Sequence, residues 1–261
     1  MPGSVSKAQI RSRIWDLMTR QGIALFPGAY GRAPTFRGLT ECIGRLRGME
    51  AWVQARRVLV LADPVLQSVR EDAVEDGKTL VVPDLSRCAG EWILEIDPSA
   101  LKGPAAREAA RASGCACGAP LAGVRALHGH ETAPVDLMVI GAVAVNRGGA
   151  RIGRGAGGAD LVYALARDRG ILRAETPVMV LVHRVQIFEE PLDREPTDLP
   201  IDYIVTPEGV ITIEAVVMRP KGLHPSMITP QRLETYPGLR EILEREGIPL
   251  PEKGWGARQA G

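Results

Sequence analysis

Hydrophobic residues recur along the chain in two alternating patterns. Unbroken apolar runs at residues 58–61, 79–82, 137–145 and 178–182 have the length and composition of buried strands. Between and around them lie segments whose apolar residues are spaced three or four positions apart, as on one face of a helix. These segments predict helices near residues 10–18, 39–46, 65–73, 105–112, 161–169 and 239–243.

One strand-helix-strand unit is well marked by its boundary residues. Asp63 and Pro64 follow the first apolar run and suit the N-cap and the first position of a helix. Gly77 stands where a helix commonly ends, and the next apolar run follows it. This order predicts a parallel strand pair joined by a right-handed crossover.

The remaining patterns extend the same fold class. Residues 91–96 resemble another strand, and short strands at 203–206 and 210–214 flank a Pro-Glu-Gly turn, as in a hairpin. Alternating strands and helices favour one α/β domain over residues 1–261, with three layers and a mostly parallel sheet. Residues 248–261 are expected to form a frayed tail.

Composition narrows the functional classes. The formal net charge of +1 argues against a general nucleic-acid surface, and no apolar run approaches the roughly 20 residues of a membrane helix. The N-terminus lacks the apolar core of a signal peptide. Four cysteines form no dense disulfide framework, so we expect a cytoplasmic protein with reduced thiols. From the charge and the apolar runs we expect no nucleic-acid and no membrane partners. The oligomeric state stays open.

The main candidate for chemistry is the glycine-rich stretch at residues 146–160. It lies between the apolar run 137–145 and the predicted helix 161–169, as a phosphate cradle would. Arg147, Arg151 and Arg154 add positive charge. The stretch is no P-loop, since no Gly-Lys-Ser/Thr ends it, and its Gly-x-Gly-x-x-Gly spacing is a weak signal alone. The alternative is a flexible turn.

Three carboxylates allow two interpretations each. Asp160 is either an N-cap of the following helix or a Mg²⁺ ligand beside bound phosphates. Asp198 and Asp202 precede a predicted strand and could hold a metal or orient an amine, or they could belong to a solvated turn.

Basic and metal-ligating residues elsewhere are also ambiguous. Ser6 and Gln9 fit a capping box at the start of the first helix. Lys7 and Arg11 are four residues apart and share one face of it, where they either reach phosphates or are simply solvated. His183 is either catalytic or a hydrogen-bonded core residue. A further group is able to bind zinc, although its spacing is unusual and a plain loop is favoured: Cys115, Cys117, His128 and His130.

Three segments together resemble the 5-formyltetrahydrofolate cyclo-ligase (methenyltetrahydrofolate synthetase) family, and most of all its cyclo-ligase-like paralogous branch. They are residues 58–83, residues 136–163 with the glycine-rich loop, and residues 182–206. The resemblance implies a fold of the ribose-phosphate isomerase and CoA transferase type. It also implies a Mg-ATP reaction in which a formyl oxygen is phosphorylated, a neighbouring nitrogen closes onto that carbon, and phosphate leaves.

The resemblance further implies roles for particular residues. Phosphates would be held by basic residues near Lys7 and Arg11, with Arg154 and Asp160 as the catalytic pair. Mg²⁺ would lie near Asp160 or Asp202. The cofactor-binding set would be Lys7, Arg11, Gly153, Arg154, Gly155, Gly157 and Asp198.

The chain also departs from the family pattern. Gly158 and Ala159 stand where the family has two tyrosines, and Thr197 stands where it has a histidine. No glutamate occurs at residues 65–67, where the family has one that contacts folate. The leading hypothesis is therefore a Mg-ATP-dependent ring closure on a reduced folate or related heterocycle. The alternative is a divergent nucleotide- or partner-binding paralog, with a link to thiamine metabolism suspected for this branch.

Overall fold

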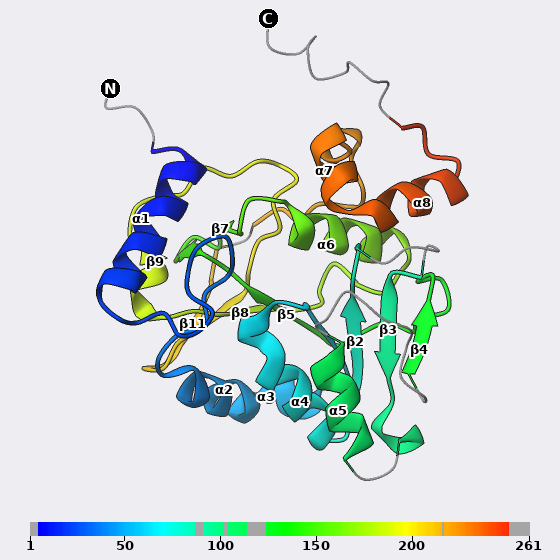
Figure 1. Ribbon diagram of the computed structural model, residues 1–261, viewed down its shortest axis with the longest axis horizontal. Coiled ribbons are helices and arrows are strands. Elements are labelled where there is room, and N and C mark those ends of the chain that lie inside the picture. Colours follow the sequence, from blue (N-terminus) through cyan, green and yellow to red (C-terminus); the bar gives the residue numbers. More distant parts are fainter. Residues whose placement is uncertain (1–4, 87–90, 102–103, 114–123, 216, 251–261) are drawn as a thin grey trace, which may run out of the picture.

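A mixed eight-stranded sheet organises the protein (Figure 1). The computed structural model describes residues 5–86, 91–101, 104–113, 124–215 and 217–250, so most of the expected C-terminal tail lies outside the described residues. The strand order is β11-β10-β8-β5-β1-β2-β3-β4. The strands are β1 (Arg57–Val60), β2 (Thr79–Pro83), β3 (Ile93–Ile96), β4 (Val124–Leu127), β5 (Leu137–Gly141), β8 (Val178–Leu181), β10 (Tyr203–Val205) and β11 (Val210–Thr212).

Strand direction divides this sheet into a parallel centre and antiparallel edges. The neighbours from β10 through β8, β5 and β1 to β2 all pair in parallel. Antiparallel pairs add β11 at one edge and β3 and β4 at the other. The predicted parallel pair β1–β2 and the hairpin β10–β11 are therefore confirmed.

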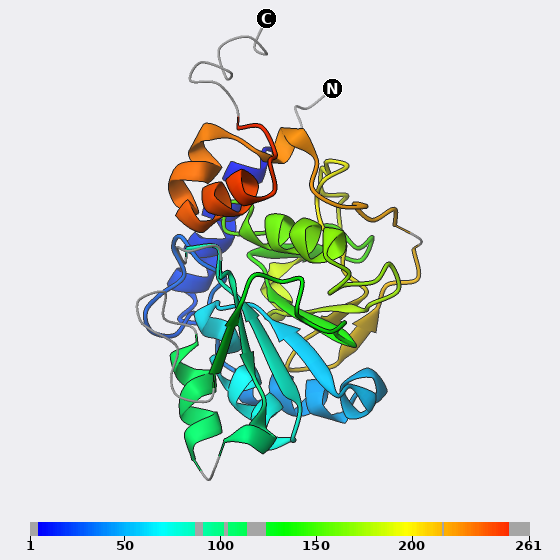
Figure 2. The same cartoon turned by 90° about the vertical axis from the view of Figure 1, so that its right-hand side faces the viewer.

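Helices cover both faces of the sheet, as Figure 2 shows from the side. This agrees with the expected layered α/β arrangement. On one face lie α2 (Leu39–Gly48), α3 (Glu50–Gln54), α4 (Gln67–Glu75) and α5 (Ala105–Ala112). On the other lie α6 (Gly158–Asp168), α7 (Pro230–Thr235) and α8 (Pro237–Arg245). None of the helices in the described ranges is both long and apolar enough to span a bilayer, and a cytoplasmic location remains a prediction.

The apolar run at residues 137–145 is not one strand, contrary to the prediction. The chain leaves the large sheet after Gly141 and enters a three-stranded sheet as β6 (Ala144–Asn146), beside β7 (Arg151–Ile152) and β9 (Ile187–Phe188). Gln186 donates hydrogen bonds to the carbonyl oxygens of Ala142 and Val143, which satisfies the backbone at the break. Both sheets are buried here, so the apolar pattern continues across the bend.

The glycine-rich stretch likewise divides into two parts. Its first half is the tight turn between β6 and β7, where the Asn146 side chain accepts hydrogen bonds from the backbone of Gly148 and Ala150. Its second half, residues 153–157, is a loop that leads directly into α6. The expectation of one continuous phosphate turn over residues 146–160 is therefore too long.

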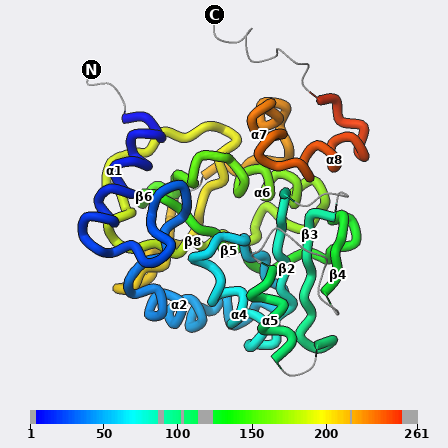
Figure 3. The backbone as a smooth tube through the Cα atoms, in the orientation of Figure 1, coloured from blue at the N-terminus to red at the C-terminus, as the bar shows by residue number. Residues whose placement is uncertain are grey.

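The two ends of the described chain approach this loop from either side (Figure 3). The N-terminal helix α1 (Lys7–Arg20) begins with the predicted capping box between Ser6 and Gln9. Near the C-terminus, α7 and α8 pack beside α6, and Gly238 at the start of α8 donates a backbone hydrogen bond to Leu85 O at 3.0 Å. That bond fixes the C-terminal helices next to the end of β2.

Candidate functional site

A cavity of about 420 Å³ opens where the central parallel strands end. Its floor is formed by the segments that follow β1 and β2 and by Gly141 at the end of β5. The loop 153–157 and the first turn of α6 lie across it. Open α/β sheets commonly bind ligands at the carboxyl ends of their strands, so this is the expected place for a site.

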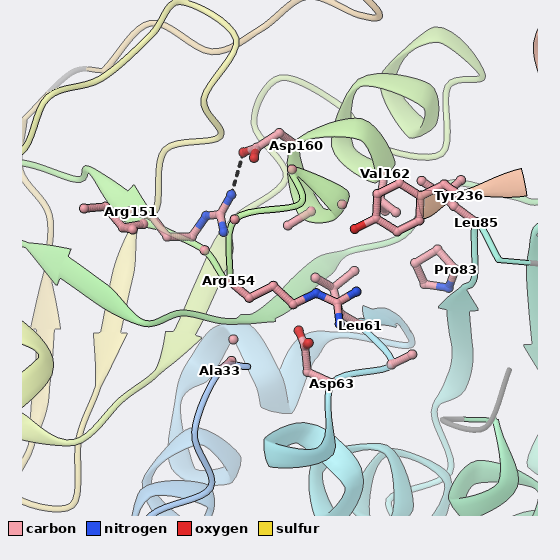
Figure 4. A pocket seen from close by; sticks show the side chains of 18 of the residues that line it. Ala33, Leu61, Asp63, Pro83, Leu85, Arg151, Arg154, Asp160, Val162 and Tyr236 are labelled. Atoms are coloured by element: carbon pink, nitrogen blue, oxygen red, sulfur yellow. Dashed lines mark hydrogen bonds and ion pairs between the residues drawn. The ribbon is translucent and has the colours of Figure 1, made fainter. Parts of the chain in front are cut away.

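Arg151 and Asp160 fix the shape of the loop. Arg151 is 6% exposed, and its Nη2 lies 2.5 Å from Asp160 Oδ1 (Figure 4). The same carboxylate oxygen accepts a hydrogen bond from the Leu199 backbone at 3.0 Å. A β-carbon on Gly153 would stand 2.7 Å from Arg151 Nη1, so a glycine is needed there for the guanidinium to pack beneath the loop.

Arg154 extends from the loop into the cavity and meets Asp63 on the floor. Figure 4 shows the Asp63 carboxylate turned toward the Arg154 guanidinium. Burial raises the pKa of Asp63, and Arg154 and Arg151 only partly oppose this. Burial alone would lower the pKa of Arg154, but Tyr236 and Asp63 favour its charged form, so that the pKa is raised. Arg154 is thus a charged group that extends into the cavity.

Helix α1 supplies two more cations at the cavity rim. Lys7 Nζ lies 2.6 Å from Asp198 Oδ2 and 3.4 Å from Glu195 Oε1. Arg11 Nε donates a 2.7 Å hydrogen bond to Gly153 O, which attaches the helix to the loop. Burial and the neighbouring Arg151 lower the pKa of Arg11, with Asp198 opposing them. Crowded cations of this kind would be relieved by a bound anion.

The C-terminal helices close the remaining side with Arg232 and Tyr236. Tyr236 lies beside Leu85 and Pro83, on the apolar side of the cavity (Figure 4). Leu61 and Val162 continue this apolar wall. The cavity therefore has a cationic half under the glycine loop and an apolar half under Tyr236.

Comparison with known proteins identifies the family of this chain. The sequence model of the 5-formyltetrahydrofolate cyclo-ligase family matches residues 3–207. The chain belongs to this family. The methenyltetrahydrofolate synthase domain-containing proteins of mouse and human are 35% and 32% identical to it over 244 residues, which is 93% of this chain. The chain spans only 64% and 62% of their lengths.

A solved structure agrees on the fold. The 5,10-methenyltetrahydrofolate synthetase of Aquifex aeolicus, determined by NMR, covers 81% of this chain and 94% of its own, with a TM-score of 0.51 and 17% identity. The family match ends at residue 207, so α7 and α8, with Arg232 and Tyr236, follow the part that defines the family.

The structure brings most residues of the expected cyclo-ligase site together. The following predicted residues line the cavity: Lys7, Arg11, Gly153, Arg154, Gly155, Gly157, Asp160 and Asp198. Asp202 is not among them, because its carboxylate is held by Arg219 and by the backbone N–H of Val178 near the start of β8. A metal at Asp202 would therefore lie apart from the loop.

The other candidate residues also lie elsewhere. His183 accepts a hydrogen bond from the Val185 backbone and caps a short 3₁₀ helix, which agrees with the structural interpretation. Cys115 and Cys117 lie outside the described residues. His128 and His130 are near Arg245 and Glu246, away from the loop. Among the described residues, no group of three or more metal-ligating side chains occurs.

Phosphates fit the cationic half of the cavity. Arg151 Nε is buried with no hydrogen-bond partner in the described structure, and glycines in the loop have no β-carbon to keep a ligand from their backbone N–H groups. The cavity is lined by the carboxylates of Asp63, Asp84, Asp160, Glu195 and Asp198, of which no three form a metal-binding group among the described residues. Mg²⁺ commonly binds one or two carboxylates together with substrate phosphates. The residues present therefore fit Mg-ATP better than a metal bound by protein alone.

Three residues of this site were not identified from the sequence. The sequence favours Asp63 as an N-cap, but its side chain makes no capping hydrogen bond. Its position after a buried strand was the signal that could have indicated a site residue. Arg232 and Tyr236 had no such signal, because only the docking of the C-terminal helices places them at the loop.

Proposed function

We propose that this protein is a Mg-ATP-dependent cyclo-ligase that closes a ring on a formylated reduced folate or a related heterocycle. The observation that carries the proposal is Arg154, a cation that extends from the glycine loop into the cavity, toward Asp63 and beside an apolar wall. ATP would supply the phosphoryl group that activates the formyl oxygen as a leaving group. The family membership and the fold support the same reaction class.

The chain's own residues would bind and orient the reactants. Lys7 and Arg11 would neutralise phosphate oxygens at the rim, and Arg154 would stabilise the charge that develops on the transferring group. Backbone N–H groups at Gly155 and Gly157 would add donors from the loop. Asp160 would act through Arg151, or hold a water of the Mg²⁺ ion.

The apolar half would receive the heterocycle. Leu61, Pro83 and Leu85 line it, and flat ring systems bind well to such surfaces. Placing the ring there would bring its formyl group next to Arg154, where the two halves of the cavity meet.

Calorimetry with Mg-ATP tests the proposal directly. The wild type is expected to bind, and Arg154→Ala is expected to weaken binding about tenfold or more, since it removes a charged hydrogen-bond donor. Arg147→Ala is the matched control, because Arg147 lies in the same glycine-rich stretch but is exposed and paired with Glu189. Absence of binding by the wild type would refute the proposal.

Turnover distinguishes the enzyme from a binding protein. With 5-formyltetrahydrofolate and Mg-ATP, the cyclo-ligase should release ADP and phosphate in equal amounts, with Arg147→Ala unaffected. Binding of Mg-ATP without turnover of this or related formylated heterocycles would favour the nucleotide-binding paralog. The observation that favours this second function is the presence of Gly158 and Ala159 where the family has two tyrosines.

A further inference from the structure

We propose that Arg232 and Tyr236, from the helices that follow the family-matched residues, are ligand-contacting residues that bind the phosphate chain of the nucleotide. This inference rests on the proposed function, since it names further contacts for the same Mg-ATP. It assigns a binding role to a segment that the family match, which ends at residue 207, does not include.

Gly157 and Gly158, at the start of α6, are in close contact with Arg232 of α7 and with Tyr236, which follows α7. A β-carbon on Gly157 would lie 2.7 Å from Arg232 Nε and 2.8 Å from its Cζ. A β-carbon on Gly158 would lie 3.0 Å from Tyr236 Cζ and closer still to the hydroxyl oxygen. Real β-carbons do not approach other atoms so closely, so both side chains dock on bare backbone at the start of α6.

The Tyr236 hydroxyl is buried, and its O–H donates no hydrogen bond to any of the described residues. Tyr236 is 5% exposed, and its oxygen lies close enough to the Arg154 guanidinium to favour that cation, although the two form no hydrogen bond of ordinary geometry. A buried hydroxyl without a partner is costly, and a ligand oxygen in the cavity would satisfy it. This second observation is independent of the helix terminus and points to a bound polar group.

Arg232 and Tyr236 are held firmly in these positions. Arg232 Nη1 donates a 2.9 Å hydrogen bond to Met227 O, and α7 is capped by the Thr229 side chain. Gly238 binds Leu85 O, and Leu233, Leu239 and Ile242 of the two helices are buried. The two polar groups are therefore presented by a packed element, which lowers the entropy cost of binding.

The chemistry of the two groups fits the phosphate chain. Arg232 adds a planar donor at the N-terminus of α6, where the helix dipole also favours negative charge. Tyr236 adds a neutral donor next to Arg154, on the border with the apolar half. A chain of phosphates can accept from both at once, because it carries several oxygens in a row.

The test measures Mg-ATP affinity in Tyr236→Phe and Arg232→Gln. We expect each to weaken binding about tenfold, as for loss of one hydrogen bond to a charged group. Tyr236→Phe keeps the ring and its packing, so its thermal midpoint should match the wild type or exceed it. Arg232→Lys keeps the charge but not the planar donors, so its Mg-ATP affinity should lie between those of the wild type and Arg232→Gln.

Controls separate this inference from the proposed function. Arg240→Gln and Tyr203→Phe change exposed or half-buried residues outside the cavity lining and should bind as the wild type does. If Arg154→Ala weakens binding while Tyr236→Phe and Arg232→Gln do not, the inference is wrong and the proposed function stands. If the wild type binds neither Mg-ATP nor inorganic pyrophosphate, both are wrong.

Discussion

The hydroxyl oxygen of Tyr236 occupies the space that a β-carbon on Gly158 would need. Gly158 is the first residue of α6, and Tyr236 joins α7 to α8, so the two lie 78 residues apart and meet only in the folded chain. The family pattern places an aromatic residue in this part of the loop. In this chain Gly158 has no side chain, and the aromatic ring next to it is that of Tyr236, which lies between α7 and α8.

Gly158→Ala tests how tightly these two residues are matched. The added methyl group should displace Tyr236 and lower the free energy of unfolding by about 1–3 kcal/mol, as overpacking of a filled site does. Urea denaturation measures the loss. In the Tyr236→Phe background the same change should cost less, because the closest atom has been removed.

Gly44→Ala is the matched control for that experiment. Gly44 lies within α2 and has open space where a β-carbon would go. There the alanine should stabilise the helix by up to about 1 kcal/mol. Equal costs for Gly158→Ala with and without the Tyr236 hydroxyl would show that the two residues are not coupled.

Asp160 offers a second prediction, on whether it is a structural or a metal-binding residue. Asp160→Ala leaves the buried Arg151 without its ion-pair partner and should lower the free energy of unfolding by roughly 3–5 kcal/mol. Removing both charges with Arg151→Met and Asp160→Leu should recover part of this loss. Urea unfolding of the three variants gives the comparison.

Binding measurements on Asp160→Asn then separate the two roles. If Asp160 holds a water of the Mg²⁺ ion, the variant should lose ATP affinity only when Mg²⁺ is present. If it acts only by fixing Arg151, the loss should be the same with and without Mg²⁺. Wild-type affinity under both conditions would contradict both roles.

The local parts of the fold were accessible from the sequence. The unit from β1 through α4 to β2 was predicted because its boundary residues and apolar periods act within a few positions of one another. The bend after Gly141 was missed because the sheets on either side are both buried and so have the same apolar pattern. Gln186, 45 residues later, stabilises that bend.

The site could be predicted from the sequence only in part, because some of its residues are brought together by long-range contacts. Lys7, Arg11 and Arg154 line the cavity, and family resemblance and charge both indicate them in the sequence. Asp63 occupies the N-cap position expected from the sequence, yet its carboxylate turns toward Arg154, since the fold places a cation above it. Arg232 and Tyr236 depend on long-range docking, which no local pattern encodes.

A third prediction concerns Lys7 and Asp198, which form a half-buried ion pair at the rim. If Asp198 only positions Lys7, the double variant Lys7→Ala/Asp198→Ala should bind Mg-ATP as weakly as Lys7→Ala alone. The coupling energy would then lie in the range of about 0.5–3 kcal/mol found for contacting pairs. Calorimetry on the four proteins measures it, and strictly additive losses would place Asp198 in contact with the ligand or metal.

Arg13→Ala is the control for that cycle. Arg13 is exposed on the same helix, lies over the Phe188 ring and does not line the cavity. Its removal should leave Mg-ATP affinity unchanged. A loss equal to that of Lys7→Ala would mean that the effect comes from the helix as a whole rather than from the pair.

The last prediction follows from the pKa of Asp63, which burial raises above its ordinary value of 3.8. At lower pH, both folded and unfolded chains hold this proton. As pH rises from 3.8, the unfolded chain releases it first, so Asp63 lowers the stability of the wild type until its own folded pKa is passed. Asp63→Asn cannot ionise, so its stability advantage should grow by about 1.4 kcal/mol for each pH unit within that window.

Urea unfolding between pH 3.5 and 8 measures this difference, and Asp97→Asn supplies a control of opposite sign. Hydrogen bonds from the Ser99 side chain and backbone lower the pKa of Asp97, so its contribution is present above pH 3.8 and is lost as pH falls. Asp97→Asn should therefore be less stable than the wild type at neutral pH. If Asp63→Asn behaved in the same way, attraction to Arg154 would outweigh burial, and Asp63 would be a charged partner of that arginine at every pH of interest.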